Sequence, residues 1–298
     1  MTAPKLHHYV PQFHLRRFVD ERSMLWAWDK LSDRIFRTPP KGVAAEKQFY
    51  RLTQYEADGH DPLAMEKQLS EMEGEVSLIT DQWLKWLPQM APLDKVPIPS
   101  INRWIVARFL AVQVLRTRDT RELLSALVRA QGGEPIDVQE LHTELIWNLD
   151  VVERLAKRFR RSIWIFARNK CATPFVTSDN PVAFRSPDNR QWLRSPFWVP
   201  GAYLVFAMSP SAVLYCHPRE GAFRKLNKFA DCLSPVVLDD GMVESENSGQ
   251  VFMASRLVLS NRREFEAERA FASTIGTDIN APASTSSAGS ESDFVLKD

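Results

Sequence analysis

The sequence predicts an α+β protein, with three long helices followed by a mainly antiparallel sheet. Between about residues 63 and 161, apolar residues recur every three or four positions, as on the buried face of a helix. From about 162 to 260 the pattern changes to short apolar runs bounded by proline, which is typical of strands. Because the helical and strand-like segments are segregated and do not alternate, their order favours α+β over a doubly wound parallel fold.

A β-hairpin is expected near the N-terminus. Apolar and aromatic runs at 24–30 and 35–37 flank a polar tetrapeptide at 31–34, and Pro39-Pro40 ends the pairing because proline cannot donate to a ladder.

The three predicted helices follow this hairpin. The first carries an apolar stripe from Met65 to Trp83, and the second runs from about Ile101 to Gly132, where a Gly-Gly pair can end a helix. The third begins at Asp137, with Glu140 placed as in a capping box.

The second half supplies the predicted strands and the tail. Strands are expected at 161–167, 174–177, 203–207, 212–216 and 236–238, and a helix at 243–255 should lead into a further apolar run at 257–259. We expect one globular domain over 1–279. The Ser- and Ala-rich segment 280–298 is expected to be disordered because it can bury little apolar surface.

Composition restricts the class of protein. Apolar residues make up 44 % of the 298 residues, charged ones 25 %, and the formal net charge is +1, so nucleic acid could be held only by a local basic patch. Three isolated cysteines favour a reducing compartment, and no apolar run suits a signal peptide or a membrane span. These features predict a cytoplasmic protein without a membrane partner.

Common catalytic motifs are missing. The sequence has no Walker loop, GxGxxG, HExxH, GxSxG or paired CxxC, which disfavours the commonest nucleotide-binding, zinc-protease and serine-hydrolase classes.

The tract LHHYVPQFHLRRF, residues 6–18, holds three of the six histidines: His7, His8 and His14. Neutral imidazoles bind divalent metals and transfer protons near neutral pH. The adjacent Arg16 and Arg17 could hold a phosphate through forked donors. The alternative is structural: the apolar residues of the tract anchor it while the histidines form local hydrogen bonds.

Carboxylates elsewhere could complete a site. Asp179, with Asn180 beside it, follows an expected strand and could bind a metal, although both residue types also stabilise turns. Glu66 and Glu73 are seven residues apart and therefore share one helical face, where paired carboxylates suit metal binding or acid–base work.

Other charged residues could likewise belong to a functional site or be ordinary surface and helix-end charges. Glu46 and Lys47 lie beside aromatic residues and could serve a metal site, or they could be ordinary surface charges. Arg116 and the basic run 157–161 could contact phosphates, or they could be solvated helix ends.

The order of these motifs resembles a known family. The segments HHYVPQFHLRRF, WAWDK, AAEKQFY, VLRT, FVTSDNP and MSPSAVLY are similar to the largely bacterial family called domain of unknown function 4238, over most of residues 7–260. His14 stands where the resemblance leads us to expect another residue, often tyrosine. The resemblance places the following residues in recurring motifs and implies no activity: His7, His8, Asp29, Glu46, Lys47, Arg116, Asp179 and Asn180.

These observations lead to one functional hypothesis. The N-terminal histidines His7 and His8 would fold back onto Asp179 in a polar cleft, and Glu46 or Glu73 would complete a divalent metal site. The metal would assist hydrolysis of a phosphodiester, in nucleic acid, while arginines hold the substrate. The residues expected to act there, besides the metal ligands, are Lys47, Asn180, Arg16, Arg17 and Arg116.

The alternative hypothesis is a non-catalytic protein- or nucleic-acid-binding module in which the same residues stabilise the fold. Convergence of the distant polar motifs in one concave site would favour the enzyme.

Overall fold

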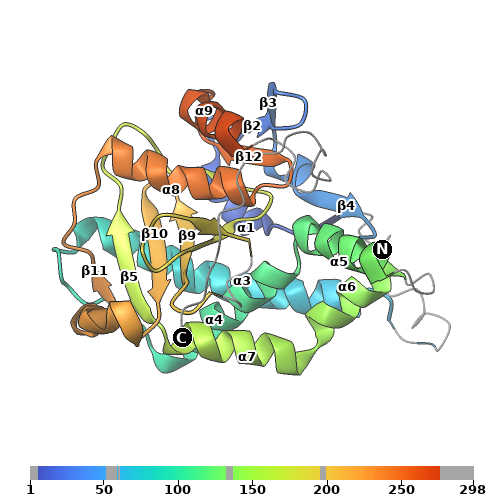
Figure 1. The fold of residues 1–298 in the computed structure, drawn as a ribbon, viewed down its shortest axis with the longest axis horizontal. Coiled ribbons are helices and arrows are strands. Elements are labelled where there is room, and N and C mark those ends of the chain that lie inside the picture. The colour runs from blue at the N-terminus through green and yellow to red at the C-terminus, as the bar shows by residue number, and fades with distance from the viewer. Residues whose placement is uncertain (1–5, 52–58, 60, 132–136, 195–198, 276–298) are drawn as a thin grey trace, which may run out of the picture.

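The computed structural model describes residues 6–51, 59, 61–131, 137–194 and 199–275. The fold is mixed α and β, as the sequence predicts, with 48 % of the described residues in helices and 20 % in strands. Figure 1 shows helices α3, α4 and α7 on one side of the large sheet and α8 on the other. The predicted disordered tail, 280–298, lies outside the described residues.

The large sheet has six strands in the order β11-β5-β10-β9-β7-β8. Its neighbouring strands are antiparallel except β11 and β5, which run parallel. The strands are β5 (Ile163–Arg168), β7 (Val182–Arg185), β8 (Trp192–Leu193), β9 (Tyr203–Ser209), β10 (Ala212–His217) and β11 (Cys232–Leu233).

The predicted N-terminal hairpin is confirmed, and it belongs to a second sheet. Strands β2 (Leu25–Asp29) and β3 (Arg34–Thr38) pair antiparallel, and β12 (Leu257–Ser260) pairs with β2 on its other edge. Strand β6 (Thr177–Ser178) then pairs with β12, giving the order β3-β2-β12-β6. Segments from both ends of the described chain therefore form one sheet, which brings the TSDNP motif beside the hairpin.

The helical region contains five helices where three were predicted. They are α3 (Ala64–Trp86), α4 (Ser100–Leu115), α5 (Arg118–Gln131), α6 (Val138–Trp147) and α7 (Leu149–Arg161). The Asp137 cap is confirmed, because its carboxylate accepts from two backbone N–H groups of the first turn of α6.

Two breaks divide the predicted helices. The side chain of Asn148 accepts from the backbone N–H of Val151 at 3.1 Å and so starts α7 as a cap. At the end of α4, the hydroxyl of Tyr50 donates to the carbonyl of Arg116 at 3.0 Å. Thr117 then caps the next turn through a bond from the N–H of Thr120 at 3.4 Å.

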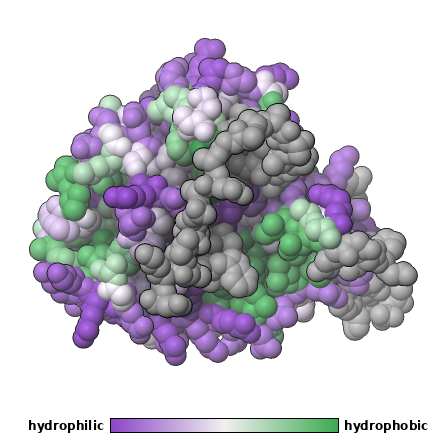
Figure 2. All heavy atoms as spheres, in the orientation of Figure 1, coloured by the Kyte–Doolittle hydropathy of each residue, from purple (hydrophilic) through white to green (hydrophobic). Residues whose placement is uncertain are grey.

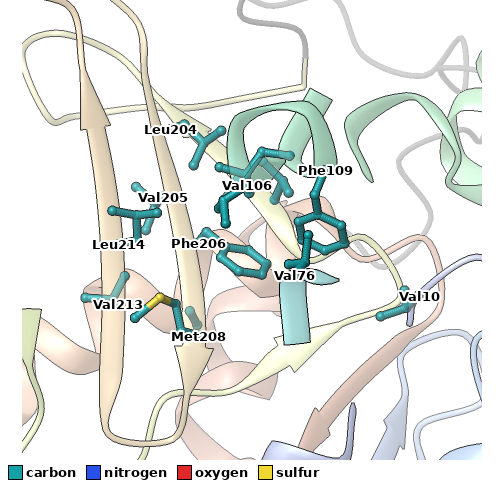
Figure 3. Packing of buried hydrophobic residues seen from close by; sticks show 14 of the residues in the cluster. Val10, Val76, Val106, Phe109, Leu204, Val205, Phe206, Met208, Val213 and Leu214 are labelled. Carbon is teal, nitrogen blue, oxygen red and sulfur yellow. The ribbon is translucent and has the colours of Figure 1, made fainter. Parts of the chain in front are cut away.

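The main hydrophobic core lies between α4 and the large sheet. The ring centroids of Phe109 on α4 and Phe206 on β9 are 6.2 Å apart, with Val76 of α3 and Val106 of α4 beside them (Figure 3). Most residues of α4 from Val106 to Leu115 are buried, as its apolar run predicts.

The second half departs from prediction in detail. The segment 236–238 is not a strand, since Val236 and Val237 are 54 % and 78 % exposed and make no ladder. The predicted helix at 243–255 is α8 (Asp240–Met253), and α9 (Glu266–Ile275) was not predicted. The remaining elements are β1 (Leu6–His8), α1 (Gln12–Leu15), η1 (Arg16–Phe18), η2 (Pro40–Gly42), β4 (Ala45–Lys47), η3 (Leu87–Gln89) and η5 (Gly221–Phe229).

Of the helices that the structure describes, none is both long enough and apolar enough to cross a bilayer.

Candidate functional site

Strand β1 sends the paired histidines in different directions, because successive side chains of a strand point to opposite faces. It pairs antiparallel with β4, so that His7 lies opposite Glu46 in the backbone register. His7 is fully buried; its Nδ1 accepts from the backbone N–H of Tyr50 at 3.0 Å, and its ring stacks on the Tyr50 ring at 6.0 Å. His7 therefore joins β1 to the segment after β4.

His8 faces a group of charged side chains. Burial is the largest influence and lowers its pKa below the usual 6.5, while a backbone hydrogen bond at Lys41 and the charge of Glu73 partly offset this shift. The nearby Arg116 and Arg16 lower the pKa further. His8 is therefore neutral at pH 7 and able to accept a proton.

Arg116 is the most buried charged residue of this group. Its side chain is 0 % exposed, its Nη1 donates to Glu73 Oε1 at 2.7 Å, and its Nε donates to Gln113 Oε1 at 2.9 Å. Gln113 is oriented in turn by donating to the Tyr9 carbonyl at 3.0 Å. Arg116 Nη2 is buried and has no hydrogen-bond partner among the residues that the structure describes. A guanidinium whose Nε and Nη1 are held by the protein, and whose Nη2 can still donate, is suited to binding an oxyanion.

Glu66 completes the group from the first turn of α3. Burial, and after it the charge of Glu73, raises its pKa to about 7 against the opposing charge of Arg116. Glu66 and Glu73 thus face the same region, as their seven-residue spacing predicts. We name His8, Glu66, Glu73 and Arg116 the acid–base cluster.

The titration of Glu66 has an effect on stability that can be measured without any substrate. Its pKa is about 7 in the folded protein and near 4.5 in an unfolded chain, so the folded state binds more protons between these values. The free energy of unfolding should therefore fall as pH rises from about 4.5 to 7. Glu66→Gln should flatten this part of the curve, measured by urea denaturation at several pH values. Glu75→Gln, an exposed change on the same helix, should not flatten it.

Asp179 is not in the acid–base cluster. It is buried, and its carboxylate accepts from the backbone N–H groups of Ser255, Arg256 and Leu257 at 2.9–3.0 Å and from the Ser255 hydroxyl at 3.2 Å. Burial raises its pKa to about 6, although these hydrogen bonds act in the opposite direction. Asp179 therefore holds the turn between α8 and β12.

Neighbouring motif residues also make structural contacts. Asn180 Nδ2 donates to Asp119 Oδ2 at 3.3 Å, which joins the TSDNP motif to the first turn of α5. The buried Lys30 Nζ donates to the carbonyls of Val251 and Ala254, at the end of α8, at 2.8 and 2.9 Å. These polar groups bring distant segments together.

A second pair from the same sheet has a similar role. Asp29 Oδ2 accepts from Nη2 and Nε of Arg256 at 2.7 and 3.0 Å, which joins β2 to the turn that Asp179 holds. The Asp29 carboxylate also accepts from the backbone N–H groups of Leu31 and Ser32, so it organises the hairpin turn.

The N-terminal tract does meet the TSDNP motif, but through His14. Its Nε2 lies 3.0 Å from Thr177 Oγ1, and its ring stacks on Phe206 at 5.0 Å. Complete burial lowers the pKa of His14 to about 3, so the ring stays neutral. His14 is thus part of the core rather than of the acid–base cluster.

The remaining predicted residues are divided between structure and surface. Arg17 is bound to α3, where its Nη2 donates to Thr80 Oγ1 at 2.5 Å and Asp81 Oδ1 at 2.7 Å, so it joins the N-terminal tract to that helix. Arg16 is exposed and donates to Gln12 at 3.0 Å. Glu46 and Lys47 lie exposed on β4.

Among the described residues, the predicted metal ligands do not come together in one group. No three histidine, cysteine or carboxylate side chains among the described residues are grouped as metal ligands. Of the proposed ligands, His7 lies against Tyr50, Asp179 already accepts four hydrogen bonds, and only His8 and Glu73 share a region. The predicted meeting of both histidines with Asp179 does not occur among the described residues, because His7 accepts from the backbone of Tyr50 and Asp179 accepts from the turn at 255–257.

Gln113 and Tyr50 contact the acid–base cluster or His7, although the motifs of the sequence predict no functional role for either residue. Gln113 is the one uncharged polar side chain in the apolar run 104–115, and a buried amide requires hydrogen-bond partners. This need for partners is the feature of the sequence that marks Gln113 as a residue with buried polar contacts. Tyr50 carried no signal, because its contacts with His7 and Arg116 are made across long sequence separations.

Comparison with known proteins gives one match. A family model described as protein of unknown function (DUF4238) matches residues 6–264. Neither the curated proteins nor the solved structures contain a match.

Proposed function

Because the chain belongs to the DUF4238 family, whose description names no activity, we propose its function from the geometry: hydrolysis of a phosphodiester at the acid–base cluster. The observation that carries the proposal is a fully buried Arg116 whose Nη2 has no partner within the described part of the chain, beside a carboxyl group with a pKa of about 7. Perturbed groups of this kind concentrate at functional sites.

Each residue of the cluster has a role in this proposal. Arg116 binds the non-bridging phosphate oxygens and stabilises the charge that develops on them. Neutral His8 accepts a proton from the attacking water, whose oxygen forms the new bond to phosphorus. Glu66, in its protonated form, donates a proton to the leaving oxygen as the old phosphorus–oxygen bond breaks. Glu73 orients Arg116 through the 2.7 Å ion pair.

The divalent metal expected from the sequence is not used in these steps. The residues grouped around His8 offer two carboxylates that already have a cationic partner in Arg116. No step in the proposal is therefore assigned to a metal, and activity is expected to survive chelation.

The second candidate is the non-catalytic binding module. It is favoured by the hydrogen bonds of Asp179, Asn180 and Lys30, since these residues are occupied in joining segments of the fold. In this reading Arg116 would bind an anionic ligand without changing it.

The enzyme and the binding module are distinguished by whether the protein hydrolyses a phosphodiester substrate. The full chain should hydrolyse bis(4-nitrophenyl) phosphate, a general phosphodiester probe, in the presence of EDTA. Glu66→Gln and His8→Gln should each lower kcat by about 100-fold, within the usual range for loss of a general acid or base. Glu75→Gln should retain the wild-type rate. Absence of turnover, or equal rates in all four proteins, would reject the enzyme and leave the binding module.

A further inference from the structure

A groove between α7 and the large sheet is lined by exposed cations. Its volume is about 810 Å³. The basic residues that line it are Arg154, Lys157, Arg158 and Arg161 on α7, and Arg219 on the turn after β10. Buried apolar side chains, including Phe159, Phe184, Leu204 and Cys216, form the adjoining wall. Glu220 is the only acidic residue in the lining.

These cations are concentrated well beyond the composition of the chain. The segments 149–161 and 217–229 together hold nine Lys and Arg residues against three Asp and Glu residues, whereas the whole chain has a net charge of only +1. Hydrophilic residues also line the lower rim of the molecule in Figure 2, where α7 lies in Figure 1. Basic residues in the last turn suit a helix C-terminus, but Arg154 and Lys157 precede that turn.

The groove cations remain available for a ligand. Lys157 forms an exposed ion pair with Glu153 at 3.0 Å, while the four arginines have no carboxylate partner within the described ranges. Arg219 is held in place by donating to the Arg161 carbonyl at 2.6 Å and to Asn227 Oδ1 at 2.8 Å. One wall of the groove therefore presents a fixed cation and the other a row of cations along a helix.

We propose that this groove binds the phosphate backbone of a single-stranded nucleic acid. A concave channel with cations on two sides follows a single backbone and neutralises successive phosphates. An anionic bilayer would favour a flat or protruding basic surface that inserts apolar side chains, whereas the apolar residues here lie buried in the groove. This surface is separate from the acid–base cluster and shares no residue with it.

The test is binding of a fluorescein-labelled 20-nucleotide single strand of mixed sequence, in DNA and RNA forms with phosphorothioate linkages that resist hydrolysis, by anisotropy with the full chain in EDTA. If five cations contact phosphates, log affinity should fall with log salt at a slope of about −3.5. The combined change of Arg154, Lys157 and Arg158 to Gln should weaken binding at least tenfold. The matched control changes Arg22, Lys170 and Arg190, all exposed elsewhere, to Gln and should weaken it less than twofold.

Other outcomes would overturn the proposal. They are no binding by the wild type, equal weakening in both triple variants, or groove-dependent binding only to vesicles containing anionic lipid. Circular dichroism shows whether each variant is folded. Should the groove variant fail to fold, Arg158→Gln alone should still weaken binding about threefold, and unchanged affinity would reject the groove. Glu66→Gln should bind the strand as the wild type does, so failure of the proposed hydrolysis and failure of this surface are distinguishable.

Discussion

Asp179→Ala should lower the free energy of unfolding by about 3 kcal/mol or more. The change leaves three backbone N–H groups of the α8–β12 turn without their acceptor, and each unsatisfied buried group costs about 1–3 kcal/mol. Asp179 is itself buried, whereas Ser255 and Leu257 are half-buried and Arg256 is exposed, so the lower end of this range applies to each N–H group. Urea denaturation at pH 5, below the Asp179 pKa of about 6, measures the loss, because ionisation of a group with a raised pKa removes part of the stability that it contributes.

Asp150→Ala is the matched control for this experiment. Asp150 is exposed in the first turn of α7, and a surface change there should alter stability by no more than about 0.5 kcal/mol. If Asp179→Ala is as mild as this control, Asp179 does not hold the turn, and its role as a ligand would need to be reconsidered.

Arg116→Lys should reduce kcat/KM for the phosphodiester by about 100-fold or more while the protein remains folded. Lysine keeps the positive charge near Glu73 but cannot donate to Gln113, Glu73 and a phosphate oxygen with one planar group. Loss of one preorganised donor to a developing negative charge has an effect of about this size.

Arg118→Lys provides the comparison two residues further along the chain. Arg118 is partly exposed and pairs with Glu122 one helical turn away at 2.8 Å, an arrangement that lysine can reproduce. The kcat/KM of Arg118→Lys should stay within about twofold of the wild-type value, because substitutions on the surface usually have small effects. Equal effects of the two substitutions would show that Arg116 has no special role.

Local sequence signals predicted much of the fold. The apolar stripe predicts helix α3, and the end of the stripe lies within three residues of the observed C-terminal end of the helix. The alternating aromatic runs predict the β2–β3 hairpin. Asparagine is a common cap residue, so Asn148 is a local signal from which the break before α7 can be predicted. The break after α4 cannot be predicted locally, because it depends on the Tyr50 hydroxyl reaching the Arg116 carbonyl across 66 residues.

The candidate site was predictable only in part. Helical spacing placed Glu66 and Glu73 on one face, and that relation is present in the structure. The pairing of both histidines with Asp179 failed because β1 turns His7 into the core, while His14 makes the contact with the TSDNP motif. Burial separates the half-buried His8 from the fully buried His7 and His14, and burial depends on tertiary packing that no local pattern contains.

The pH dependence of kcat/KM, compared between the wild type and Glu66→Gln, tests the acid–base cluster most directly. Since the acid must be protonated and the base neutral, wild-type activity should fall above a pKa of about 7 and below the lowered pKa of His8. In Glu66→Gln the residual activity should lose the alkaline limb and keep the acidic one. An alkaline limb that persists unchanged in Glu66→Gln, or activity that EDTA abolishes at every pH, would contradict the account.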